Sequence, residues 1–198
     1  MGVQILEYDT PVATGSIMLT LSIENAAADD HALSYGARLA ARMKRDLLIV
    51  HAVHEPGDKP GLYRQLDQQM MHVPLRDLAL NICRQRIEDL YSRQPELKPL
   101  ESPALIVIPG LPATRILQIA KAMLPCCIVM QKNHPTVLGK LLRTSITDNV
   151  VKHSLCPVVL IDSGVGNTAL DSLLLEISHL SANSHASPKG STPLHIPV

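Results

Sequence analysis

The side chains best suited to binding or catalysis lie in the segment 126–162, where short apolar runs alternate with polar stretches. An apolar run at 127–130 is followed by a polar loop, a predicted helix that begins near Ser145 and a second apolar run at 158–161. Thr144 and Ser145 bring two hydroxyls to the predicted helix start. The unpaired N–H groups and the dipole of a helix start favour anions. Anion binding is therefore one chemistry that this pattern indicates.

Histidines offer a second chemistry. His51 and His54 have a His-x-x-His spacing, which is compatible with zinc binding in other settings, and His134 could join them at the edge of a sheet. The sequence fixes no carboxylate or cysteine beside them. We interpret these histidines as loop and strand-end residues and predict no metal site.

Cysteines offer a third chemistry. Cys126 and Cys127 are adjacent, and neighbouring side chains of a strand point to opposite faces, so we interpret them as two small buried residues rather than a redox pair. With Cys83 and Cys156 remote in sequence, the four cysteines form no disulfide framework. This pattern favours a reducing, cytoplasmic location.

Catalysis requires a nucleophile or base that a partner holds in place. The sequence contains no G-x-S-x-G, H-E-x-x-H or C-x-x-C pattern. Ser145 has no identifiable base beside it and is better explained as a helix cap, with Asp148 three residues further on. We therefore predict no catalytic residues and no enzyme activity.

Composition excludes several classes of partner. The chain has 198 residues, and Lys plus Arg equals Asp plus Glu at 18 each, so no net field favours nucleic acid. The first residues lack a basic, apolar leader pattern, and no run of eighteen apolar residues occurs. We expect neither export nor insertion into a membrane.

Five apolar runs alternate with helical patterns. The predicted strands are 17–21, 47–50, 104–108, 127–130 and 158–161, and the predicted helices are 27–45, one from Leu75, one from Pro112 and one from about Ser145. We also expect a turn-rich loop over 51–61. Such alternation predicts an α/β fold, a doubly wound five-stranded parallel sheet with helices on both faces. Ligands of such sheets bind outside the carboxyl ends of the strands, here Ser22, Val53, Gly110 and Met130 to His134.

Residues 15–162 hold all of these elements and form the predicted domain. Residues 1–14 show no sustained periodicity and are predicted to be an N-terminal extension. In the tail, residues 163–198, an amphipathic helix is predicted at 168–180, followed by a disordered segment rich in Ser, Pro and His.

The stretch His153-Ser-Leu-Cys-Pro-Val158 resembles the H-x-x-C-P-V element of the universal stress protein family, and Gly110-Leu-Pro112 leading to Ile116 is similar to that family's G-x-P-x-x-x-I. The resemblance covers about residues 15–162. It implies the same sheet as in universal stress proteins, a fold also similar to that of adenine nucleotide alpha hydrolases.

The family's phosphate loop, G-x2-G-x9-G-[ST], has lost its glycines in this chain. Counting back from the H-x-x-C-P-V element, the three glycine places hold Gln131, His134 and Thr144, while Ser145 keeps the Ser/Thr place. Side chains at these places hinder the close approach of backbone N–H groups to phosphate. Ser22 stands where nucleotide-binding members carry an Asp. The resemblance thus implies a degenerate nucleotide site. Its positions are Ser22, Val53, Met130, Gln131, His134, Thr144 and Ser145. We expect no cofactor, and binding of ATP is doubtful.

The fifth strand should lie at an edge of the sheet if the family's strand order holds. The resemblance implies a homodimer that forms through this strand, residues Val158, Val159, Leu160 and Ile161. Alternatively, the chain's own tail covers this edge, lies across the partner subunit or docks on another protein.

We therefore predict a cytoplasmic protein like the universal stress proteins, dimeric and acting in stress response through protein contacts. One alternative is a nucleotide- or anion-responsive switch that binds ATP or AMP through Thr144, Ser145 and the helix start. A second alternative is a metal-dependent or hydrolytic enzyme.

Overall fold

The computed structural model describes residues 15–23, 25–55, 61–66, 73–132 and 146–161. Their core is a five-stranded parallel sheet of order β3-β2-β1-β4-β5. The strands are β1 (Ile17–Thr20), β2 (Leu47–Val53), β3 (Ala104–Pro109), β4 (Cys127–Gln131) and β5 (Val158–Ile161). The predicted sheet is confirmed, and β5 lies at its edge.

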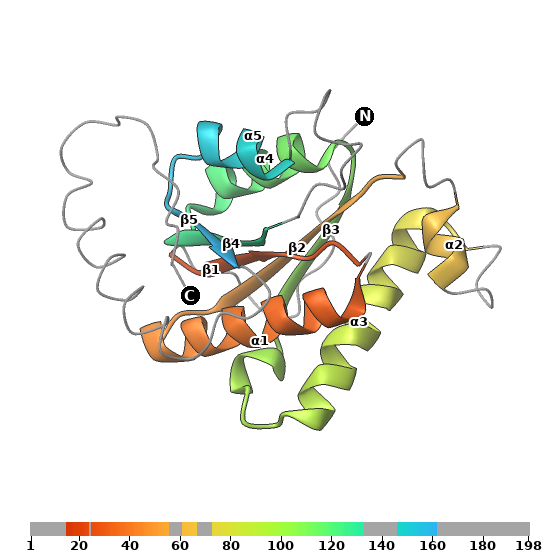
Figure 1. Cartoon of the computed structure of the whole chain (residues 1–198), viewed down its shortest axis with the longest axis horizontal. Helices are drawn as coiled ribbons and strands as arrows, with labels where there is room; N and C mark the ends of the chain where they lie inside the picture. The colour runs from red at the N-terminus through yellow and green to blue at the C-terminus, as the bar shows by residue number, and fades with distance from the viewer. Residues whose placement is uncertain (1–14, 24, 56–60, 67–72, 133–145, 162–198) are drawn as a thin grey trace.

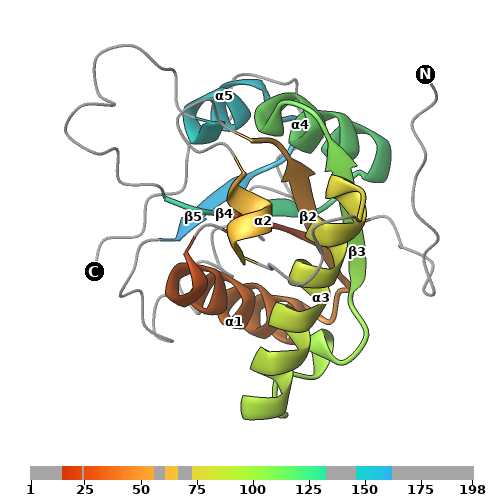
Figure 2. The same ribbon diagram turned by 90° about the vertical axis from the view of Figure 1, so that its right-hand side faces the viewer.

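Helices cover both faces of the sheet. In Figure 1, α1 (Ala26–Met43) and α3 (Leu75–Arg93) lie below the sheet, and α4 (Pro112–Met123) and α5 (Ile146–His153) lie above it. The side chains accordingly form two clusters, one between β1 and α1 that includes Leu19 and Leu33, and one beneath α4 that includes Ile116 and Ile128. Figure 2 shows the short α2 (Leu62–Leu66) in front of the sheet, near the end of β2.

Helix α1 begins and ends as its sequence dictates. Its N-cap is Asn25, whose side-chain oxygen accepts the Ala28 N–H at 3.2 Å. It ends at Lys44, whose backbone adopts the left-handed conformation with φ 52°. Gly36 brings the helix backbone onto β1, because a Cβ there would lie 3.3 Å from Leu19 Cδ2.

Several predicted bounds differ from the observed ones by one or two residues, and two stretches differ more. Strand β2 was predicted to end at Val50 but continues to Val53, because the polar ring of His51 finds partners inside the protein, described below. Helix α2 and the 3-10 helix η2 (Lys98–Leu100) were not predicted, since Pro99 and the turn residues before Leu62 masked these short elements.

The prediction that Cys126 and Cys127 point to opposite faces is wrong. Cys126 precedes β4 rather than belonging to it, so the alternation of a strand does not apply, and it packs against the same α1-side cluster as Cys127. Cys127 is fully buried, whereas Cys126 is half-buried.

Several predictions fall outside the described residues. These are the N-terminal extension 1–14, the loop residues His134, Thr144 and Ser145, and the tail with its predicted helix 168–180. Within the described part of the chain, no helix is long and apolar enough to cross a membrane.

Candidate functional site

A cavity of about 110 Å³ opens at the carboxyl ends of β1, β2 and β4. This is the edge at which parallel α/β sheets bind ligands. Helix α5 contributes Ile146 and Thr147 from its first turn, and α4 contributes Pro112 from its start. The polar side chains of the lining are Thr20, Ser22, Asp29, His51, His54, Tyr63, Gln131 and Thr147.

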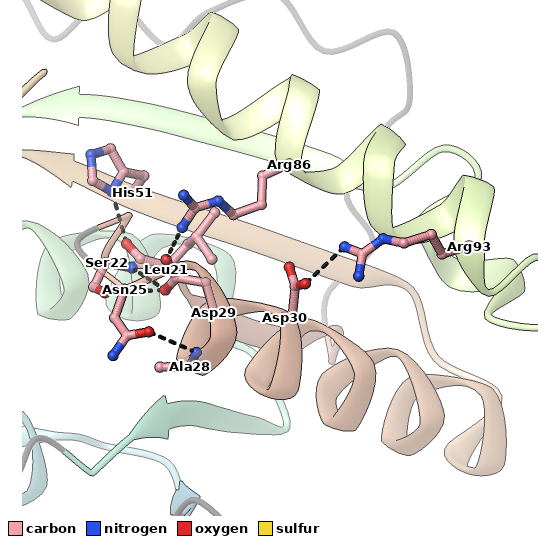
Figure 3. A network of polar contacts seen from close by, with 9 residues as sticks. All are labelled: Leu21, Ser22, Asn25, Ala28, Asp29, Asp30, His51, Arg86 and Arg93. Carbon is pink, nitrogen blue, oxygen red and sulfur yellow. Dashed lines mark hydrogen bonds and ion pairs between the residues drawn. The ribbon is translucent and has the colours of Figure 1, made fainter. Parts of the chain in front are cut away.

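Asp29 holds the turn that follows β1. Its Oδ1 accepts the Ser22 N–H at 3.3 Å and the Ser22 hydroxyl at 3.1 Å, as Figure 3 shows. Its Oδ2 forms an ion pair with Arg86, which reaches across from α3. One carboxylate thus ties together the β1–α1 turn, α1 and α3.

Burial is the dominant influence on this carboxylate. It raises the pKa of Asp29, and the charge of Arg86 and the Ser22 hydrogen bonds oppose the rise only in part. Asp29 is 2% exposed, so loss of Arg86 would leave the Asp29 carboxylate without a countercharge in a buried place.

The same turn contains an unusual backbone conformation. Ile23 is fully buried and has φ 63°, which a β-branched residue rarely adopts. The surrounding contacts must compensate for the cost of this conformation. The turn is therefore held in one shape by the burial of Ile23 and by the Asp29 hydrogen bonds beside it.

His51 lies at the floor of the cavity, and both of its ring nitrogens are engaged. Nδ1 lies 2.8 Å from the Leu21 carbonyl oxygen, which can only accept, so Nδ1 carries the proton. Nε2 then accepts from the Tyr63 hydroxyl at 3.0 Å. The Tyr63 oxygen in turn accepts the His54 N–H at 3.1 Å, which closes a chain of three hydrogen bonds.

This environment keeps the imidazole neutral. Burial lowers the pKa of His51 to about 4, and the hydrogen bond to Leu21 offsets only part of that effect. Arg86 contributes a smaller lowering. Because His51 is uncharged and both of its ring nitrogens are hydrogen-bonded, its role is structural: it packs in the floor of the cavity.

The predicted site residues are distributed as follows. Ser22, Met130 and Gln131 line the cavity. Val53 does not: it belongs to the α1-side cluster, and its carbonyl accepts the Gly110 N–H at 3.1 Å. The loop positions His134, Thr144 and Ser145 are not among the described residues. Of the three histidines considered as metal ligands, only His51 and His54 can be placed, and no group of three potential ligands occurs within the described part of the chain.

Sequence analysis missed Asp29, Arg86 and Tyr63 as site residues. Asp29 lies in the first turn of a helix, where an acidic residue is ordinary, although its burial shows another role. A usable signal was the position of Arg86 between Cys83 and Ile87, within the apolar stripe of α3. Tyr63 follows a turn-rich stretch and carried no signal of its own.

The chain was compared with known proteins by sequence and by structure. A model of the universal stress protein family matches residues 19–162. The search of curated proteins by sequence finds no match.

Solved structures of universal stress proteins resemble the described fold. A putative universal stress protein from Pseudomonas aeruginosa UCBPP-PA14 matches with a TM-score of 0.52 and 14% identity over 88% of this chain and 54% of that one. A universal stress protein from Archaeoglobus fulgidus matches with a TM-score of 0.49 and 16% sequence identity, over 74% of this chain and 98% of that one. The universal stress protein UspA from Lactobacillus plantarum matches with a TM-score of 0.46 and 22% sequence identity, over 75% of this chain and 99% of that one. Since the family model matches well over half of the length of this chain, the chain belongs to the universal stress protein family.

Proposed function

We propose that this chain is a cytoplasmic, homodimeric universal stress protein that acts in stress response through protein contacts, with a degenerate nucleotide site and without catalytic activity. The observation that carries the proposal is the hydrogen bonding among the polar side chains that line the cavity. Four of the eight polar side chains that line it are already paired with one another, through the Ser22–Asp29 and His51–Tyr63 hydrogen bonds.

The size of the cavity supports this proposal. Sites for small molecules usually enclose about 300–1,000 Å³, whereas this cavity encloses about 110 Å³. Tyr63 is 1% exposed and, with Leu62, forms part of its wall. Entry of a nucleoside would require these side chains to leave their partners, and the cost would reduce affinity.

The glycine places of the family motif add an independent argument. Gln131 is the last residue of β4 and pairs with Ile161, so the strand continues through the first of these places. Gln131 therefore brings a side chain to a strand end where the family's glycine leaves the backbone open to close approach. His134 and Thr144 occupy the other two places by sequence.

A nucleotide- or anion-responsive switch is the second candidate, and one observation favours it. Ile146 and Thr147 line the cavity, so the first turn of α5 borders the cavity and its N–H groups are close to any anion bound there. Binding would then depend on Ser145 and Thr144, which precede this turn.

A thermal-shift titration separates the two candidates. Binding to the native state adds RT ln(1 + [L]/Kd), which is about 2.7 kcal/mol when the ligand is at roughly one hundred times its Kd. We expect no rise in melting temperature with magnesium and ATP or AMP up to about 1 mM, because the cavity is small and internally paired.

Saturable stabilisation that the double variant Thr144→Ala, Ser145→Ala abolishes would contradict the proposal and establish the switch. The control is Ser154→Ala, which removes a hydroxyl from the opposite end of α5. It should leave any nucleotide response unchanged.

A further inference from the structure

Three of the four cysteines lie where β4 and β5 begin, at the end of the sheet opposite to the cavity. Cys126 directly precedes β4, Cys127 opens it, and Cys156 lies two residues before β5. The proposed function uses none of them. Cys83 is buried in α3 and belongs to a different part of the fold.

The register of the sheet places Cys126 beside Cys156. Ile128 pairs with Val158, and the Ile128 N–H donates to the Pro157 carbonyl at 2.9 Å. Each cysteine precedes its paired residue by two positions. The strands that begin just after these cysteines are neighbours, about 4.8 Å apart, and a disulfide spans roughly 4.4–6.8 Å between Cα atoms. The charge of Cys126 also acts on the pKa of Cys156, so the two thiols lie near each other.

The surroundings of Cys126 favour its thiolate. Its sulfur is hydrogen-bonded to the Cys127 thiol and lies near the positive charge of Arg45, and these contacts lower the pKa of Cys126 against the effect of burial. The pKa of Cys127 is raised well above its usual value, mainly by the same hydrogen bond and by burial, so Cys127 remains a thiol that can donate. Cys126 is also half-buried, which leaves its sulfur within reach of a small reagent.

Cys156 is accessible from the other face of the sheet. It lines a groove of about 290 Å³ between the ends of α4 and α5, together with Lys121 and His153. Its sulfur lies 3.5 Å from the Ser154 hydroxyl. Burial raises the pKa of Cys156, so it is protonated at neutral pH, in contrast to the tendency of Cys126.

The two cysteines pack on different sides of the sheet end. Cys126 contacts the α1-side cluster and Cys156 the α4-side cluster. Rotation of a side chain leaves its Cβ in place, so joining them requires a shift of the backbone that precedes β4 or β5. Such a shift at Cys126 breaks the hydrogen bond from its N–H to the Ser16 carbonyl at 2.9 Å but no strand pairing, whereas the backbone of Cys127 is paired with Ile17 of β1.

We propose that Cys126 is an oxidant-reactive thiol and that Cys156 captures its oxidised form, with a small hydroperoxide as the substrate class. The Cys126 thiolate attacks one peroxide oxygen, the O–O bond breaks, and the leaving oxygen departs as water or alcohol after protonation. Cys156 then loses its proton and attacks the sulfur of the Cys126 sulfenic acid, the S–O bond breaks, and the leaving hydroxide takes up that proton, so that a disulfide and one water form. Two thiols are oxidised and one peroxide is reduced.

Peptide mapping of the full chain tests this assignment. The reduced protein is treated with hydrogen peroxide, remaining thiols are blocked with an alkylating agent, and the chain is digested with trypsin. Cleavage after Lys121, Lys132 and Lys152 separates Cys126 from Cys156 but keeps Cys126 and Cys127 on one peptide. We expect residues 122–132 to be linked to the peptide that begins at His153, lighter by two hydrogen atoms than the two separate thiol peptides.

Variants distinguish the roles of the cysteines. Cys126→Ser should abolish the link with an unchanged circular dichroism spectrum, and Cys156→Ser should leave a sulfenic acid on Cys126 that dimedone traps. Cys83→Ala is the matched control and should retain the link. A bridge within residues 122–132, a bridge between two chains, or a folded protein in which Cys126 survives peroxide unmodified would each overturn the proposal.

Discussion

Asp29 is the residue that ties the turn after β1 to α1 and α3. Asp29→Asn removes the negative charge opposite Arg86 while keeping the size of the side chain. Breaking one partner of a buried ion pair costs about 3 kcal/mol or more. We expect a loss of that order in the free energy of unfolding, measured by urea denaturation at pH 7.

Asp30→Asn provides the control for this prediction. Asp30 pairs with Arg93 at 2.7 Å between the same two helices, but the Arg93 side chain is 56% exposed. Exposed pairs contribute roughly 1 kcal/mol or less. Equal losses from the two substitutions would show that burial of the Asp29 pair has no energetic significance.

His51 makes the stability of the protein depend on pH. Its pKa is about 4 in the folded protein and 6.5 in the unfolded chain, so the folded state binds fewer protons between these values. Its stabilising contribution is complete above about pH 6.5 and is lost as the pH falls towards 4. The full change amounts to roughly 3 kcal/mol.

Urea denaturation at several pH values, in the wild type and in His51→Asn, measures this contribution. The variant should be less stable at neutral pH and should lose less stability than the wild type between pH 7 and pH 4. Identical pH slopes in both proteins would contradict the role assigned to His51.

At the scale of elements, the end of α1 offers a test of backbone conformation. Lys44 is exposed and left-handed, with φ 52°, a conformation that glycine adopts without steric cost. We expect Lys44→Gly to raise the free energy of unfolding by about 1 kcal/mol.

Ala41→Gly is the matched control, since Ala41 is exposed and lies within the same helix. Glycine in a helix interior costs about 1 kcal/mol. The two glycine substitutions should therefore change the denaturation midpoint in opposite directions. A decrease in both would show that the left-handed cap carries no strain.

The sequence was most informative about elements with strong hydrophobic patterns. Strand β5 was predicted with the bounds that the structure shows, because its apolar run is bordered by Pro157. Strand β2 was predicted three residues too short because a histidine normally marks a polar boundary. The partners that make His51 acceptable come from Leu21 and Tyr63, which lie far from it or across a loop in sequence.

The candidate site was less predictable for the same reason. Ser22, Met130 and Gln131 could be named because a strand's end can be located from its own residues. Arg86 could not be placed, because its contact with Asp29 joins residues 57 positions apart. Site geometry therefore depended on helix packing, which periodicity does not specify.

For the whole molecule, the proposed dimer leads to a test on β5. The Pro157 carbonyl accepts the Ile128 N–H of β4, and the Ile161 carbonyl accepts the N–H of Lys132, the residue directly after β4. Because bonding directions alternate along a strand, the Leu160 N–H points away from β4 towards the edge. We expect Leu160→Pro to yield a monomer in light scattering, because proline removes this outward donor and leaves the β4 pairing intact.

A chain that ends at residue 162 is the companion control and should remain dimeric. If the Leu160→Pro variant remains a dimer and keeps a native circular dichroism spectrum, pairing through the β5 edge is excluded. Loss of the dimer only in the truncated chain would assign the association to the tail.

The close approach of Gly36 to Leu19 has a mechanical consequence. With the backbone of α1 resting on β1, the strand and the helix cannot slide or separate without losing that contact, so they form one rigid unit. The turn between them, with Asp29 at its far side, has little freedom to hinge. The ion pair of Asp29 with Arg86 joins this turn to α3 as well, so a change in the shape of the turn would have to break that contact or carry it along.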